Sequence, residues 1–257
     1  MPTALITGAS SGIGAAFARR LARDGCDLIL VARRRERLEE LASELRTAHG
    51  IRAETMATDL AQIAGIEQVE ACIAAQGALD LLINNAGFGT YARFPEVSAA
   101  RHTDMINVHI TASVRLMRAA LPAMLARGRG GIINVASISA FFPLPGNGSY
   151  AASKAYLVTF SESLQREVAG SGVRVQALCP GYTVTEFHQT PEYAAFDRDR
   201  VPAKLWMSAD DVVNASLKAL RRGRVICIPG WKYRLIVALG RNHLIGEVLS
   251  ALRRRAA

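Results

Sequence analysis

One tyrosine in this sequence has a lysine at a spacing that suits acid–base chemistry. Lys154 follows Tyr150 by four residues, and none of the other five tyrosines has a lysine at that distance. Positions i and i+4 share one face of a helix, so a helix here would bring the two side chains together. A phenol ordinarily titrates at about pH 10, and a nearby cation lowers its pKa. The pair predicts a tyrosine that exchanges protons with a substrate, although the same spacing also occurs in ordinary helices.

A glycine-rich segment near the N-terminus has the pattern of a phosphate-binding turn. The apolar run Ala4–Thr7 leads into it, and a helical pattern follows. Glycines allow a tight turn and a close approach of backbone to a pyrophosphate, whose charge the N-terminus of the next helix attracts. The strand–turn–helix context favours a dinucleotide site over an ordinary glycine-rich turn. The residues expected at the phosphates are Gly8, Ser10, Ser11, Gly12, Ile13 and Gly14.

The end of the second expected strand indicates which dinucleotide is bound. A fold selective for NAD usually carries Asp or Glu there, on the ribose hydroxyls. This strand ends in Val31-Ala32-Arg33-Arg34, without an acid. Arg33 and Arg34 could hold the 2′-phosphate of NADP through charge-assisted hydrogen bonds. The alternative is a solvated first helical turn, where two cations are disfavoured. We therefore expect NADP or NADPH in preference to NAD.

The elements that carry these residues alternate between short apolar runs and longer helical stretches. Nearly continuous apolar runs are typical of parallel strands buried on both faces. The alternation predicts an α/β fold, a single Rossmann-type doubly wound parallel sheet flanked by helices, which binds ligands beyond the carboxyl ends of its strands. The expected strands are Ala4–Thr7, Asp27–Ala32, Arg52–Ala57, Leu79–Ile83, Ile132–Val135, Val173–Leu178 and Val225–Ile228. The expected helices span Gly12–Asp24, the stretch ending at Arg46, Ala61–Gln76, stretches starting near Ser98 and Ser149, and Ala209–Leu220.

Several motifs together resemble the classical short-chain dehydrogenase/reductase family, from Thr3 to about Ile228. The second strand is similar to that of family reductases that act on 3-ketoacyl, steroid and other lipophilic ketones. The motifs that carry the resemblance are Thr7–Gly14, Asp59-Leu60, Asn84–Gly87, Asn107, Ser137, Tyr150–Lys154 and Pro180-Gly181.

The resemblance implies a role for each motif residue. Tyr150 would protonate a carbonyl oxygen while the nicotinamide delivers hydride, and Lys154 would lower the pKa of the tyrosine and bond the nicotinamide ribose. Ser137 would hold the substrate oxygen, with Ser139 as the alternative because alternate residues of an extended segment share a face. Asn107 would hold a water that links Lys154 to solvent. The other expected cofactor contacts are Asp59 and Leu60 at the adenine, Asn85, Ala86 and Gly87 at the ribose, and Pro180, Gly181, Thr183 and Thr185 around the nicotinamide, beside Tyr150 and Lys154.

Two features of the sequence leave alternatives open. Asp59 and Gln62 have the spacing of a capping box for the following helix, which is compatible with a contact to adenine.

The function predicted is an NADP(H)-dependent oxidoreductase that interconverts a carbonyl and a secondary alcohol. The alternative is a non-catalytic NADP-sensing regulator or scaffold on the same fold, which would need none of the proton-transfer residues.

The segments expected to surround the substrate are 138–148 and 182–206. Their aromatic residues favour a lipophilic ketone or 3-ketoacyl substrate, although ordinary loop packing explains them nearly as well. Residues 229–257 are expected to form an amphipathic helical extension that ends in Arg253-Arg254-Arg255. An apolar stripe usually faces protein, so we expect it to cover the pocket or a neighbouring subunit, with peripheral membrane contact as the alternative.

The composition and charge of the chain limit its domain number, its compartment and its partners. The 257 residues suit one domain, 1–257, and the four scattered cysteines suit a reducing compartment and no metal site. The net charge of +9 is spread among interspersed acids and no nucleic-acid motif accompanies it, so no nucleic-acid partner is expected. The N-terminus begins with a strand rather than a secretory signal, which predicts a cytoplasmic protein. The family resemblance implies a homodimer or homotetramer.

Overall fold

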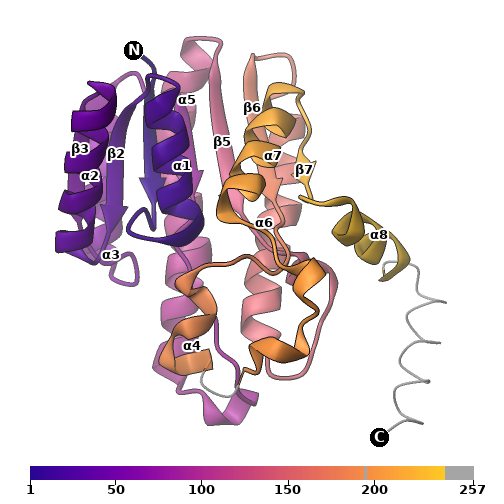
Figure 1. Cartoon of the computed structure of the whole chain (residues 1–257). Helices are drawn as coiled ribbons and strands as arrows, with labels where there is room; N and C mark the ends of the chain where they lie inside the picture. The colour runs from indigo at the N-terminus through magenta and orange to yellow at the C-terminus, as the bar shows by residue number, and fades with distance from the viewer. Residues whose placement is uncertain (194–195, 241–257) are drawn as a thin grey trace, which may run out of the picture.

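Seven parallel strands form one sheet in the order β3-β2-β1-β4-β5-β6-β7 (Figure 1). The computed structural model describes residues 1–193 and 196–240. The strands are β1 (Thr3–Thr7), β2 (Asp27–Ala32), β3 (Ala53–Ala57), β4 (Leu81–Asn84), β5 (Gly130–Val135), β6 (Val173–Leu178) and β7 (Ile226–Cys227). The chain order reverses between β1 and β4, which is the switch point where such sheets bind ligands. The predicted doubly wound α/β fold is confirmed.

Helices cover both faces of the sheet because neighbouring residues of a buried strand point to opposite sides. Ile6 of β1 joins the core under α1, α2 and α7, whereas Leu5 joins the core under α3, α5 and α6. Figure 1 shows α1 and α7 in front of the sheet, with α5 and α6 behind it. The helices are α1 (Gly12–Arg23), α2 (Arg35–His49), α3 (Ile63–Gln76), α4 (Ala99–Ile106), α5 (Ala112–Ala126), α6 (Gly148–Glu167), α7 (Ala209–Arg221) and α8 (Trp231–Gly240).

Two helical stretches differ from the expectation. The stretch that begins after Ser98 is interrupted by a π-helical turn, Asn107–Thr111, between α4 and α5. The capping box expected at Asp59 is wrong, because α3 begins at Ile63 with Gln62 as its N-cap. Asp59 Oδ1 instead accepts the N–H of Ala61 at 3.0 Å, which forms a local turn before the helix.

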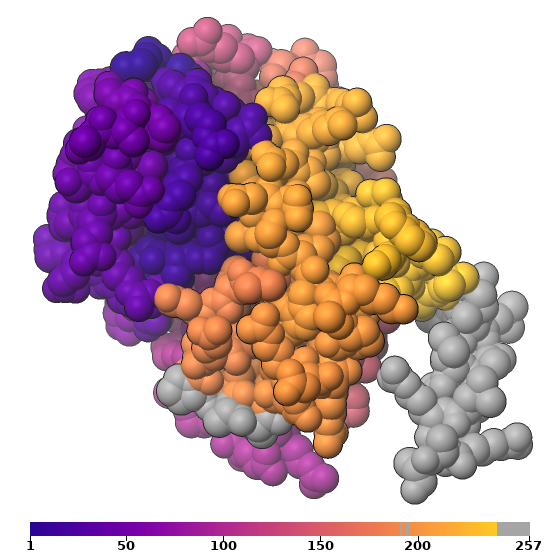
Figure 2. Space-filling view, in the orientation of Figure 1, coloured from indigo at the N-terminus to yellow at the C-terminus, as the bar shows by residue number. Residues whose placement is uncertain are grey.

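The described part of the connection from β6 to α7 contains short 3₁₀ turns and an isolated β-bridge between Thr183 and Met207, and it forms the lower part of the face in Figure 2, beneath α7. The helix α8 packs against the 3₁₀ turn Ile138–Phe141 at the end of β5. The described part of the C-terminal extension therefore packs against one of the segments expected to surround the substrate. The predicted apolar stripe beyond Gly240 and its arginines lie outside the described residues. Among the helices that are described, none has the length and apolarity needed to span a membrane.

Candidate active site

Ser137, Tyr150 and Lys154 come together beyond the carboxyl end of β5. Tyr150 and Lys154 lie on successive turns of α6, and the Lys154 Nζ is 5.6 Å from the centroid of the Tyr150 ring. Ser137 forms a side-chain hydrogen bond with Tyr150. Its Oγ also accepts the N–H of Ser139 at 3.1 Å, which fixes Ser137 at the start of a 3₁₀ turn. The structure therefore places Ser137, rather than Ser139, against the tyrosine.

Burial moves both titrating groups toward their neutral forms. It raises the pKa of Tyr150 to about 12, and the hydrogen bond from Ser137 offsets only part of that rise. Burial also lowers the pKa of Lys154, which is 4% exposed, to about 7. The Lys154 Nζ donates to the Val135 carbonyl oxygen at 2.8 Å. In the protein alone the pKa of Tyr150 thus moves opposite to our expectation, because desolvation of the phenolate outweighs the influence of the amine.

A buried histidine, which sequence reasoning missed, links the turn after β4 to α6. His109 Nε2 accepts the N–H of Phe88 at 3.0 Å, so its proton lies on Nδ1 and is donated to Ser153 Oγ, 2.8 Å away. The Ser153 hydroxyl in turn donates to the Tyr150 carbonyl oxygen at 2.8 Å. Burial lowers the pKa of His109 well below its usual value, which keeps the ring neutral. Its partners lie in other segments, so no spacing along the chain marked this residue.

The turn after β1 brings backbone close to any bound phosphate. Gly8 and Gly12 adopt positive φ angles of 65° and 56°, and a Cβ on Gly14 would lie 2.3 Å from the Gly8 carbonyl oxygen. Ser11 is the N-cap of α1 but makes no side-chain capping hydrogen bond, so the first-turn N–H groups have no side-chain acceptor from it. The side chain of Ile13 packs on the core below the turn. These residues fit a dinucleotide whose pyrophosphate lies at the N-terminus of α1.

The loop after β4 forms the neighbouring wall. Thr7 Oγ1 accepts the N–H groups of Asn85 and Ala86 at 2.9 and 3.0 Å, and the Asn85 amide donates back to the Thr7 carbonyl oxygen at 2.9 Å. A Cβ on Gly87 would lie 3.4 Å from Lys154 Nζ. The backbone of this loop therefore lies between the phosphate-binding turn and the lysine, where the ribose contacts were expected.

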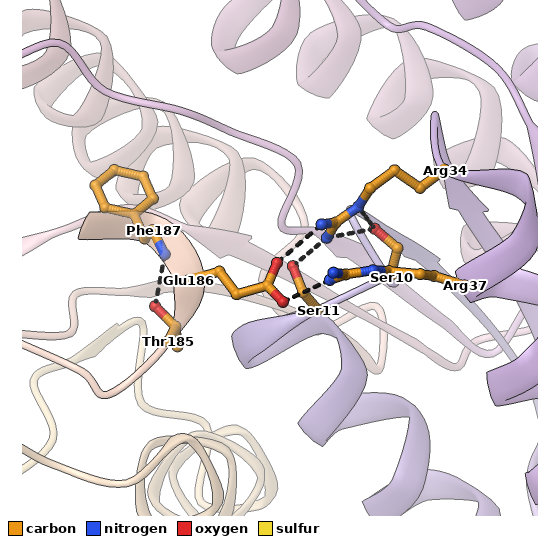
Figure 3. A network of polar contacts seen from close by, with 7 residues as sticks. All are labelled: Ser10, Ser11, Arg34, Arg37, Thr185, Glu186 and Phe187. Atoms are coloured by element: carbon orange, nitrogen blue, oxygen red, sulfur yellow. Dashed lines mark hydrogen bonds and ion pairs between the residues drawn. The ribbon is translucent and has the colours of Figure 1, made fainter. Parts of the chain in front are cut away.

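Arg34 contacts both serines of the glycine-rich turn (Figure 3). Its guanidinium donates to Ser10 Oγ at 3.1 Å and to Ser11 Oγ at 2.7 Å. It also pairs with Glu186, from the loop after β6, at 2.8 Å. Arg33 is exposed and forms no hydrogen bond or ion pair with the described residues. Of the two arginines predicted at the 2′-phosphate, Arg34 is therefore the one positioned at the turn.

Two of the remaining predicted residues do not reach the expected groups directly. The Asn107 amide donates to the Ala61 carbonyl oxygen at 3.0 Å, and within the described chain it makes no direct hydrogen bond to Lys154. A water would still be needed to connect the two, as the proposed relay requires. The Leu60 side chain lies in the core beside α3, so only its backbone can face a ligand.

The loop after β6 approaches the turn from the other side. The Pro180 carbonyl oxygen accepts the N–H of Ile138 at 3.0 Å, which joins the loop to the segment after β5. Thr183 Oγ1 donates to the Gly181 carbonyl oxygen at 3.0 Å. Thr185 contacts the phosphate-binding turn, because a Cβ on Gly12 would lie 3.1 Å from its Cγ2.

An aromatic cluster lies directly over the tyrosine. The ring centroids of Phe187 and Tyr150 are 5.8 Å apart, and those of Phe187 and Tyr193 are 5.3 Å apart. Tyr193 packs tightly on Gly89, where a Cβ would lie 2.2 Å from the Tyr193 Oη. We call this cluster the aromatic wall; it consists of Tyr91, Tyr182, Phe187, His188, Tyr193, Phe196 and Trp206. The predicted aromatic segment therefore contacts the predicted acid–base residue through Phe187.

A phosphate-binding turn at the switch point, beside a tyrosine and a buried lysine, defines a nicotinamide-dinucleotide-dependent oxidoreductase. The model of the short chain dehydrogenase family matches residues 2–193. The chain belongs to this family, as its motifs predicted.

Three solved structures of high similarity extend across nearly the whole chain. A short-chain dehydrogenase from Sphingobium yanoikuyae in complex with NADPH is 36% identical, with a TM-score of 0.85 over 98% of this chain and 95% of that one. The bulky-bulky ketone specific alcohol dehydrogenase from Comamonas testosteroni is 32% identical, with a TM-score of 0.80 over 96% and 94%. A short chain dehydrogenase/reductase from Burkholderia phymatum in complex with NAD is 28% identical, with a TM-score of 0.83 over 96% and 95%.

Proposed function

We propose that this enzyme reduces bulky, lipophilic ketones or 3-ketoacyl compounds with NADPH, or oxidises the corresponding alcohols, with Tyr150 as the general acid or base. The observation that carries the substrate class is the contact between the aromatic wall and Tyr150, through Phe187. Aromatic rings at the reacting group favour binding of large apolar substituents. The similarity to an alcohol dehydrogenase specific for bulky-bulky ketones supports this class.

The chain's own residues account for proton transfer. When bound, the nicotinamide supplies or accepts the hydride and carries a positive charge in its oxidised form. Tyr150 enters reduction as a protonated phenol, since burial holds its pKa at about 12, and it donates that proton to the substrate oxygen. Ser137 holds the same oxygen and stabilises the phenolate that forms. Lys154, with its pKa lowered to about 7, can take up a proton near neutral pH and then stabilise the phenolate as a cation.

The preference for NADP(H) over NAD(H) is part of the proposal. Arg34, Ser10 and Ser11 form a cluster of donors beside the end of β2, and that strand ends without the acid that would bond a free ribose 2′-hydroxyl. A phosphate monoester carries about two negative charges and accepts several hydrogen bonds at once. These donors would therefore distinguish the phosphorylated ribose from the free one.

The direct test compares cofactor consumption across a series of ketones with substituents of increasing bulk. We expect NADPH to be consumed fastest with large apolar ketones. The variant Arg34→Ala should raise the KM for NADPH about tenfold or more, because hydrogen bonds to charged groups contribute about 1.5–3 kcal/mol, and leave the KM for NADH nearly unchanged. The matched control Arg33→Ala removes the neighbouring exposed cation and should have little effect. Equal losses with both cofactors in Arg34→Ala would refute the 2′-phosphate assignment.

The domain organisation, the compartment and the oligomeric state are also part of the proposal. We propose that residues 1–257 form one domain that works in the cytoplasm as a homodimer or homotetramer. The four free cysteines, Cys26, Cys72, Cys179 and Cys227, are consistent with a reducing compartment. A purely NADP-sensing regulator is less consistent with the site, because it would not need Ser137, Tyr150 and Lys154 side by side.

A further inference from the structure

A carboxylate from the loop after β6 lies beside the cofactor turn. Glu186 Oε2 is 2.8 Å from Arg34 Nη1, and Glu186 Oε1 is 2.5 Å from Arg37 Nη1 (Figure 3). The hydrogen bonds from both arginines lower the pKa of Glu186, so its carboxylate is an anion at neutral pH. Neither Arg37 nor Glu186 was singled out from the sequence.

The groups around this carboxylate form a set of donors for an anion. Figure 3 shows the Arg34 guanidinium between the Glu186 carboxylate and the hydroxyls of Ser10 and Ser11, with Arg37 on the other carboxylate oxygen. A groove beside them is lined by the glycine-rich turn and Arg37 on one side and by Glu186 on the other. A phosphate monoester has the same sign of charge and more acceptor oxygens than a carboxylate. Glu186 thus occupies Arg34, one of the donors that we assign to the 2′-phosphate, and also the neighbouring cation of Arg37.

Glu186 is also joined to the catalytic centre through its chain neighbours. Thr185 Oγ1 accepts the N–H of Phe187 at 3.3 Å, which holds the three residues in one 3₁₀ turn. Phe187 contacts Tyr150, and Thr185 contacts Gly12 of the phosphate-binding turn. A displacement of the Glu186 backbone would therefore change the packing on the catalytic tyrosine.

We propose that Glu186 determines cofactor selectivity as an internal competitor for the 2′-phosphate. A 2′-phosphate must displace the carboxylate from Arg34 and Arg37, and the displaced loop carries Phe187 away from its present contact with Tyr150. A dinucleotide without that phosphate leaves both ion pairs intact. The inference rests on the proposed function, because it assumes that Arg34 binds the 2′-phosphate.

The test measures dissociation constants of two cofactor fragments by calorimetry, with the full chain. The probes are 2′,5′-ADP, which carries the 2′-phosphate, and 5′-AMP, which lacks it. Each surface ion pair ordinarily shifts an equilibrium by about fivefold or less, and two must break. We therefore expect Glu186→Gln to bind 2′,5′-ADP about threefold to tenfold more tightly than the wild type, with 5′-AMP changed by less than about twofold.

The matched control is Glu192→Gln, which removes another carboxylate of the same loop. Glu192 pairs with Arg101 of α4, away from the glycine-rich turn. It should leave the ratio of the two dissociation constants unchanged. If Glu192→Gln tightened 2′,5′-ADP as much as Glu186→Gln, general loosening of the loop would explain the gain and the inference would be overturned. An unchanged affinity in Glu186→Gln would overturn it as well.

The variant Arg34→Ala separates failure of the inference from failure of the proposed function. If the wild type binds both fragments equally well, or Arg34→Ala keeps the preference for 2′,5′-ADP, the 2′-phosphate assignment fails and the inference fails with it. If the preference depends on Arg34 but Glu186→Gln gains nothing, only the inference fails.

Tryptophan fluorescence measures the proposed movement of the loop that carries Glu186 and Phe187. The chain has two tryptophans, so Trp206 is the single tryptophan of the variant Trp231→Phe. Its ring lies 5.4 Å from that of His188, two residues from Glu186. In this background 2′,5′-ADP should change the Trp206 emission and 5′-AMP should not. An emission unaffected by saturating 2′,5′-ADP would refute the movement of the loop.

Discussion

At the scale of single residues, one helical turn separates two groups whose pKa values burial moves in opposite directions. Desolvation favours the neutral phenol of Tyr150, at about 12, and the neutral amine of Lys154, at about 7. The phenol is then ready to donate a proton in reduction. The phenolate needs added positive charge, which an oxidised nicotinamide and a protonated Lys154 would supply together.

The shifted lysine predicts a pH-dependent effect on stability. Its pKa falls from 10.5 to about 7 on folding, so over that interval the unfolded chain binds more protons and this group's contribution to stability rises with pH. Lys154→Met removes the buried charge. It should raise the free energy of unfolding by about 1–3 kcal/mol at about pH 6, with the gain shrinking toward about pH 10.

Urea unfolding across this pH range provides the measurement. The control is Lys218→Met, which changes an exposed lysine on α7. Its difference from the wild type should not vary with pH. A constant difference for Lys154→Met would contradict the assigned pKa shift.

The sequence could predict the residues whose separation one local element fixes. Tyr150 and Lys154 needed only a helix, whereas Ser137 was chosen over Ser139 from the family resemblance. The partners of Arg34 needed tertiary structure, since Glu186 lies 152 residues further along the chain. His109 was missed for the same reason, because Ser153, its partner, is 44 residues away.

At the scale of elements, α8 fixes both ends of the loop that carries the aromatic wall. The Tyr233 hydroxyl accepts the N–H of Tyr182 at 2.9 Å and donates to the Leu205 carbonyl oxygen at 2.5 Å. Gly181 makes room for this ring, since a Cβ there would lie 2.0 Å from Tyr233 Cζ. The described part of the extension thus helps to shape the proposed substrate site.

Tyr233→Phe should loosen the aromatic wall without touching the reacting groups. Loss of the hydroxyl leaves two backbone groups without their partner, so the free energy of unfolding should fall by about 1–3 kcal/mol. The KM for a bulky ketone should rise more than kcat falls. Steady-state kinetics and urea unfolding test this, with Tyr156→Phe on the exposed face of α6 as the control. Identical behaviour of the two variants would show that the Tyr233 hydroxyl does not hold the loop.

The strands and most helices were predictable because their hydrophobic periodicity is strong. The start after Ser98 was correct, since Ser98 Oγ accepts the N–H of Arg101 as an N-cap. The π-helical turn at Asn107 was not predicted, because it accompanies a hydrogen bond from Asn107 to Ala61, 46 residues away. Local pattern could not reveal that contact.

At the scale of the whole molecule, the site exists because the sheet reverses its chain order between β1 and β4. That reversal places the glycine-rich turn beside the loop after β4, and the adjacent ends of β5 and β6 add the proposed acid–base residues and the aromatic wall. The sequence indicated a doubly wound sheet through its alternation of elements. It did not indicate that residues 183–187 lie against the phosphate-binding turn.

The central claim is that Tyr150 transfers the proton within an intact dinucleotide site, and Tyr150→Phe tests it most directly. The variant should be assayed with a ketone that the wild type reduces, and its NADPH affinity should be measured by calorimetry. We expect turnover to fall by about 100- to 10,000-fold, the contribution of a positioned acid, while the dissociation constant for NADPH changes little. Turnover close to that of the wild type would contradict the account.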